Sequence, residues 1–138
     1  MLHPSKAIEE LTKYIKDENT SSFNWLIENN FKELTQLKPA IFGEVQAMQW
    51  LVLNKFPDLA AFVNAIWEDK KAFDLLFKRK AFHWAACANI INGDPAAISF
   101  LMQHNLGAYA KLAQEIQFQL RKRGDEGTNL FTMGSPFK

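Results

Sequence analysis

The sequence predicts an all-α fold, a short helical-repeat array (α-solenoid) of about four 25-residue helix pairs. Three observations predict it. Four segments align without a gap when the sequence is shifted against itself so that Leu26 falls on Leu51. Each segment places apolar residues in the same columns, one of which contains Leu26, Leu51, Leu76 and Leu101. Within each segment the apolar positions follow the three- and four-residue spacing of a helix face.

Five further apolar columns extend this alignment. They contain Ile41, Ile66, Ile91 and Ile116; Phe23, Met48, Phe73 and Ile98; Ile27, Val52, Phe77 and Met102; Leu34, Leu59, Trp84 and Tyr109; and Leu37, Phe62, Cys87 and Leu112. A unit in a stacked array buries its apolar face against its neighbours. We therefore expect the columns to form the core, with Leu51, Ile66, Leu76 and Ile91 almost fully buried.

The N-terminal segment from Pro4 to Glu18 has the apolar pattern of a second helix, one residue out of register. We expect it to be a half-repeat whose polar outer face caps one end of the array. The other end then needs its own cover. Each of the four units that follow is expected to contain two short helices, which gives about nine helices in all.

Capping and turn residues in the sequence predict the helix boundaries. Asp69 and Asp94 occupy an N-cap column. Gly43 and Gly93 stand where a left-handed residue ends the second helix of a unit. Another column, which contains Pro57 and Gly107, marks the tight turn within a unit.

Pro39 lies inside a predicted helix, where it removes one hydrogen bond. Either that helix is a single turn, or a longer helix begins at Pro39 and runs to about Asn54. The last helix is expected to stop at Gly124. This gives a single helical-repeat domain over residues 1–124 and an irregular tail over residues 125–138. The tail contains four large apolar residues, which predict that it folds back on the fourth repeat or docks onto a second copy: Leu130, Phe131, Met133 and Phe137.

Composition limits the functions open to this chain. Its 138 residues are 48% hydrophobic, which excludes general disorder and is enough for a real core. A formal net charge of +1 argues against bulk nucleic acid or an anionic membrane as a partner. The single cysteine fits a reducing compartment, and we expect a cytoplasmic protein. Neither a secretory signal nor an apolar run long enough for a membrane span is visible.

The segment Leu26-Ile27-Glu28-Asn29-Asn30-Phe31-Lys32-Glu33-Leu34 resembles the helix–turn–helix part of an ankyrin repeat. The resemblance extends over roughly residues 19–117. It implies stacked helix pairs and the binding of a protein partner. The period, about 25 residues, is shorter than the ankyrin period of roughly 33, and no Thr-Pro-Leu-His signature opens a unit. The part that is missing corresponds to the β-hairpin finger. HEAT-like and other short α-solenoids fit the pattern equally.

The chemical candidates are few. His83 and Cys87 are four residues apart on one predicted helix and could offer two metal ligands. However, Cys87 shares its column with apolar core residues, and His83 shares one with Glu33, Asp58 and Ala108, which we interpret as an exposed first-turn position. We therefore predict no metal, no cofactor and no catalytic residue. The same core position argues against a nucleophilic thiol.

A partner-binding surface is predicted from one aromatic column and the tail. The column contains Trp25, Trp50, Leu75 and Phe100, and it either packs between adjacent units or forms an exposed groove for a peptide. Our candidate contact residues are Trp25, Trp50, Phe100, Phe131 and Phe137. Small residues such as Ala61 and Ala86 allow close packing, within the array or against a partner.

These observations favour a non-catalytic protein–protein interaction module that binds a protein or peptide and can form a homodimer. One alternative is a small nucleic-acid-binding helical-repeat protein, because lysines and arginines cluster at residues 70–80 and 121–123. Acidic residues interrupt the first cluster. The other alternative is an enzyme whose site is not readable from the sequence.

Overall fold

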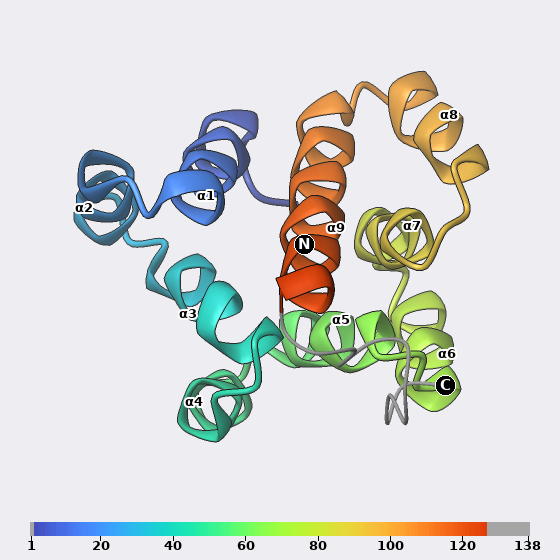
Figure 1. Ribbon diagram of the computed structural model, residues 1–138. Coiled ribbons are helices and arrows are strands. Elements are labelled where there is room, and N and C mark those ends of the chain that lie inside the picture. The colour runs from blue at the N-terminus through green and yellow to red at the C-terminus, as the bar shows by residue number, and fades with distance from the viewer. Residues whose placement is uncertain (1, 127–138) are drawn as a thin grey trace.

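A computed structural model describes residues 2–126, of which residues 125 and 126 are described by their backbone alone (Figure 1). The described chain is all-helical, which confirms the prediction of an all-α fold. Its helices are α1 (Ser5–Asp17), α2 (Thr20–Glu28), α3 (Lys32–Ile41), α4 (Val45–Leu53), α5 (Pro57–Ile66), α6 (Lys70–Lys78), α7 (Phe82–Ile91), α8 (Ala96–Gln103) and α9 (Gly107–Glu126). No described helix is long and apolar enough to cross a membrane.

Backbone geometry recurs with the same period as the apolar columns. Helices α3, α5, α7 and α9 begin at corresponding positions of successive units, as do α2, α4 and α6, and α8 begins one position late. Left-handed residues follow the same spacing, because each connection between successive helices contains one of them. These residues are Glu18, Gly43, Glu68 and Gly93, which precede α2, α4, α6 and α8, and Asn30, Lys55, Lys80 and Asn105, which precede α3, α5, α7 and α9.

Asp69 is the N-cap of α6 as predicted, whereas the N-cap of α8 is Pro95 and Asp94 lies one residue before it. The side chain of Asp69 accepts hydrogen bonds from the amides of Lys71 and Ala72, at 2.9 and 3.2 Å, and Asp94 accepts one from Ala96 at 3.0 Å. These bonds satisfy amides that have no partner within the helix. Gly43 and Gly93 have the predicted positive φ angles. Pro57 and Gly107 are the first residues of α5 and α9, so the tight turns lie just before them.

Two boundaries differ from expectation. Both options for Pro39 are wrong, because α3 has ten residues rather than a single turn and ends at Ile41, and α4 begins separately at Val45. Pro39 is tolerated two residues before the end of α3, where it deprives only one carbonyl of its partner. The last helix continues past Gly124 to Glu126. One glycine near a helix end weakens the helix without ending it.

The helices form an inner and an outer set (Figure 1). The inner helices α1, α3, α5, α7 and α9 contact one another in that order, and α9 returns to contact α1. The outer helices α2, α4, α6 and α8 lie on the periphery. Among the described helices, each of them contacts only the one just before and the one just after it in the chain.

Contact between α1 and α9 corrects the expectation of two separate ends. The side-chain amide of Gln119 donates to the carbonyl of Lys16 at 3.4 Å, and that of Gln117 donates to Ile90 at 2.9 Å. Helix α1 therefore does not cap a free end with a polar outer face. Its apolar residues Ile8, Leu11 and Ile15 are fully buried within the closed inner set.

Burial follows most of the predicted columns. Leu51 and Leu76 are 0% exposed, Ile66 is 3% and Ile91 is 9%, which confirms their prediction as core residues. Inner helices α5 and α7 bury most of their residues, and an aromatic cluster lies between α5, α7 and α9. It contains Phe62, Trp84 and Tyr109, with ring centroids 4.7 Å apart for Phe62 and Trp84 and 5.2 Å apart for Trp84 and Tyr109.

Candidate interaction surface

One predicted core column is exposed instead. Ile27, Val52, Phe77 and Met102 are 39–59% accessible to solvent. Each lies one residue after a fully buried leucine on an outer helix. An outer helix has inner helices on one side only, so its core face is narrower than the apolar pattern suggests. Large apolar side chains therefore repeat at corresponding places on the periphery.

The aromatic column divides into two halves. Trp25 and Trp50 are half-buried: Trp25 stacks on Phe31 with centroids 6.0 Å apart, and Trp50 stacks on Phe56 at 5.8 Å. A lysine lies over each indole, Lys6 at 5.7 Å from Trp25 and Lys32 at 5.4 Å from Trp50. The two indole rings are therefore already engaged in contacts within the fold.

Leu75 and Phe100, in the other half of the column, are 41% and 37% exposed. Of the candidate contact residues, Phe100 is therefore the most open among those described. Phe131 and Phe137 lie outside the described residues, as does the predicted docking of the tail.

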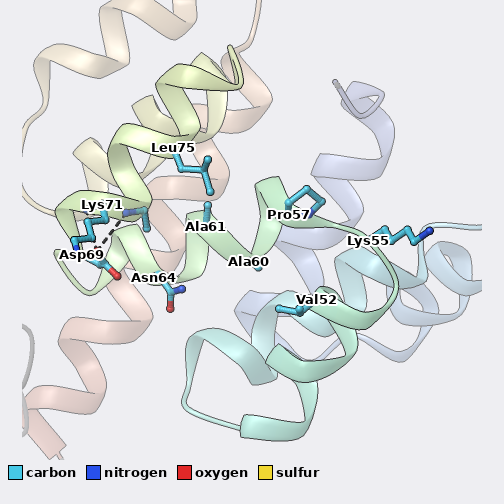
Figure 2. A pocket seen from close by; sticks show the side chains of 10 residues that line it. Val52, Lys55, Pro57, Ala60, Ala61, Asn64, Asp69, Lys71 and Leu75 are labelled. Carbon is cyan, nitrogen blue, oxygen red and sulfur yellow. Dashed lines mark hydrogen bonds between the residues drawn. The ribbon is translucent and has the colours of Figure 1, made fainter.

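Figure 2 shows a hollow of about 530 Å³ over α5, between α4 and α6. Its floor consists of the small side chains Ala60 and Ala61, with Asn64 beside them. Leu75 stands above Ala61, and Val52 lies on the opposite wall. The alanines that pack the inner helices closely also make room here for a side chain from outside.

A second hollow, of about 650 Å³, lies one unit further along the chain, beside α6, α7 and α8. Phe77 replaces Val52 at its wall, Phe82 replaces Pro57, and Phe100 replaces Leu75. The rest of its lining is Leu2, Lys80, His83, His104 and Leu106. Consecutive outer helices thus form two hollows that share four lining columns, although the second has no counterpart of the alanine floor among its lining residues.

Each hollow has a lysine at its edge. Lys55 and Lys80 occupy the left-handed position that follows α4 and α6, with φ angles of 65° and 61°. Both are exposed, and neither forms an ion pair with another described residue. A ligand for these hollows would therefore combine an apolar side chain with a negative charge.

Cys87 is fully buried on α7, and its Sγ donates to the carbonyl of Tyr109 at 3.4 Å. Burial raises the pKa of its thiol well above the usual range, so the reactive thiolate is disfavoured. Within the described residues no group of three or more histidine, cysteine or carboxylate side chains is placed to hold a metal ion. His83 and His104 line the same hollow, a proximity that the repeat alignment did not predict.

A buried polar cluster joins the N-terminal segment to the inner helices. Nε2 of His3 lies 3.0 Å from Oε2 of Glu33, and the backbone amide of His3 donates to the Tyr109 hydroxyl at 2.9 Å. The pKa of Tyr109 is raised to about 12, chiefly by burial. The expectation that Glu33 and His83 are exposed is wrong, since they are 8% and 5% accessible. His3 contacts residues in the first turns of α3, α7 and α9.

This cluster has the hydrogen-bonded histidine and carboxylate of a general-base pair. The residues around it, however, serve to hold the N-terminal segment in place. The rings of Phe31 and Trp84 lie 5.9 and 6.3 Å from the His3 ring, and the Tyr109 hydroxyl is occupied by the His3 backbone. The arrangement ties residue 3 to α3 and α9. The sequence gives no sign of it, because residues 3 and 109 meet only when the inner set closes.

The chain matches no protein-family description, no curated protein and no solved structure.

Proposed function

We propose that this chain is a non-catalytic protein-interaction module, built on a helical-repeat scaffold and acting in the cytoplasm. The two hollows along the outer helices are its contact surface. Their partner is a peptide segment, within a protein, that places one apolar side chain in each hollow. The observation that carries the proposal is the recurrence of part of the lining one unit further on, with Val52, Lys55 and Leu75 replaced by Phe77, Lys80 and Phe100.

Apolar anchors in small pockets with polar rims are the usual basis of peptide binding. Two anchors on one segment also strengthen each other, because the second binds within an already formed complex. The lysines at the rims favour acidic residues beside the anchors. Exposed ion pairs contribute little affinity, so we expect them to select among apolar peptides rather than to hold them.

Peptide display against the purified chain tests the proposal. We expect selection of segments with two large apolar residues and nearby acidic residues. The variant Lys55→Asn/Lys80→Asn copies Asn30 and Asn105, which hold the same left-handed column. It should weaken binding of the selected peptides roughly three- to tenfold. The variant Phe100→Trp, which copies Trp25 and Trp50, should fill the second hollow and weaken binding independently of salt.

The control Lys111→Gln/Lys122→Gln removes the same charge from α9, away from the lining of both hollows. It should leave binding unchanged. A selection that yields no binder contradicts the proposal. Binders that are insensitive to the asparagine variant and to Phe100→Trp would contradict it as well, since their contact surface would lie elsewhere.

A further inference from the structure

Helix α4 differs from the other outer helices in having a second apolar face. Its inner face buries Ala47 and Leu51. A stripe on its outer side consists of Val45, Met48, Gln49, Val52 and Leu53, at the spacing of one helix face. Val45 is 67% exposed and Leu53 is 78% exposed. We call these five residues the α4 stripe.

The stripe is specific to α4. The column of Val45 contains Thr20, Lys70 and Pro95 in the other units, and the column of Leu53 contains Glu28, Lys78 and Gln103. The two most exposed apolar residues of α4 thus stand where the same fold accepts polar side chains, charged side chains or a proline. The nine residues of α4 include no charge at all. A helix that is apolar on both sides is ordinarily covered on both sides.

The N-cap of α4 is also exceptional. Asn19, Asp69 and Asp94 accept backbone hydrogen bonds at this column, whereas Glu44 makes no side-chain cap bond. Lys55 lies just beyond the other end of the helix. Both side chains are exposed, and neither forms an ion pair with another residue in the described part of the chain.

We infer that the α4 stripe binds a second copy of this chain, with the two α4 helices antiparallel about a twofold axis near Gln49. In that arrangement Glu44 of each copy meets Lys55 of the other, and Val45 meets Leu53. Gln49, midway along the stripe, faces itself, and its amide can both donate and accept. A twofold contact sets a surface against itself, which a neutral stripe with opposite charges at its ends allows.

The contact is small. Nine helical residues extend over about 14 Å, so the buried area falls short of the roughly 1,600 Å² of a standard interface. A weak dimer follows. The inference does not rest on the proposed peptide binding, because Val45, Met48 and Leu53 lie outside both hollows, although the two surfaces share Val52 and Lys55.

Sedimentation velocity over a concentration series from micromolar to millimolar tests the inference on the full chain. The wild type should shift from monomer to dimer. The variant Val45→Lys/Leu53→Lys copies Lys70 and Lys78 of α6, which occupy the same columns, so it should fold normally. It should raise the dissociation constant of the dimer by more than about a hundredfold. Circular dichroism and thermal melting verify the fold.

The matched control is Thr20→Lys/Gln103→Lys, which adds the same charge at the same columns of α2 and α8. It should dimerise like the wild type. Each of Glu44→Lys and Lys55→Glu should weaken the dimer about three- to tenfold, and their combination should restore it. Dimerisation of the double variant would support the antiparallel arrangement, because only there does residue 44 of one copy meet residue 55 of the other.

Three results would overturn the inference. One is a wild type that stays monomeric at every concentration, which would leave the stripe to a different protein. Another is a Val45→Lys/Leu53→Lys variant that dimerises as well as the wild type. The third is loss of the dimer on removal of residues 127–138, which would assign the contact to the tail.

Discussion

The inner and outer helices share one repeat spacing but differ in what surrounds them. Inner helix α7 buries eight of its ten residues, among them Trp84, Cys87 and Ile91. Outer helix α6, which leads into it, buries only Ala72 and Leu76 of its nine. Both helices have repeated apolar columns. The apolar pattern therefore does not distinguish a helix that is surrounded by other helices from one that contacts them on a single side.

This difference explains where binding can occur. An inner helix places most of its apolar residues in the core, with Phe82 and Phe118 as exposed exceptions. An outer helix places two positions in the core and leaves its other apolar residues accessible. Exposed apolar groups that recur at fixed intervals are typical of recognition surfaces. Mutations at matched positions of the two sets can test how far this holds.

The largest expected effect compares two tryptophans. Trp84→Ala on α7 removes a ring that is 1% exposed and contacts Phe62 and Tyr109. It should lower the free energy of unfolding by about 3–5 kcal/mol. Trp50→Ala on α4 removes a half-buried ring stacked on Phe56, at a cost of about 1–2 kcal/mol. Urea denaturation measures both, and equal costs would break the comparison between inner and outer helices.

The next effect compares neighbours on one outer helix. Leu76 is 0% exposed and Phe77 is 47% exposed. Leu76→Ala should cost about 2–5 kcal/mol. Phe77→Ala should cost less than about 1 kcal/mol, although it deletes the larger side chain, because much of that ring already lies in water. A cost below about half a kilocalorie for Leu76→Ala would contradict the core position of its column.

The smallest effect concerns a carboxylate. Glu10 on α1 is 6% exposed, and hydrogen bonds from Lys6, Ser22 and Lys13 lower its pKa to about 2. Because the folded pKa is depressed, this stabilisation is complete above the ordinary value of 4.5 and is lost as the pH falls toward 2. At neutral pH, Glu10→Gln should cost about 1–2 kcal/mol.

The matched control for Glu10 is Asp74 on outer helix α6, whose side chain is exposed. Asp74→Asn should change stability by no more than about 0.5 kcal/mol. Thermal melts over a pH series are the measurement. The difference between wild type and Glu10→Gln should shrink as the pH is lowered. A difference independent of pH would mean that the carboxylate charge is not what stabilises this site.

Local signals predicted much of the helical framework. The N-cap aspartate of α6, the glycines at positive φ and the spacing of Leu51 and Leu76 all act within a turn or two of the chain. Their effect does not depend on what lies across the molecule. Pro39 also acts locally, because its position near the end of α3 allows the helix to continue to Ile41. The sequence by itself therefore determined the class of fold, most helix boundaries and the fully buried leucine column.

Only the tertiary structure decided which sides of the helices meet. His3 and Tyr109 are 106 positions apart, and their hydrogen bond exists because α1 returns to α9. That closure buries Glu33 at a position whose column looked solvent-exposed. The same arrangement leaves Val52 and Phe77 exposed, although the apolar columns predicted that they lie in the core. A periodic pattern fixes the angle of a side chain about its own helix axis, whereas burial depends on which other helices arrive there.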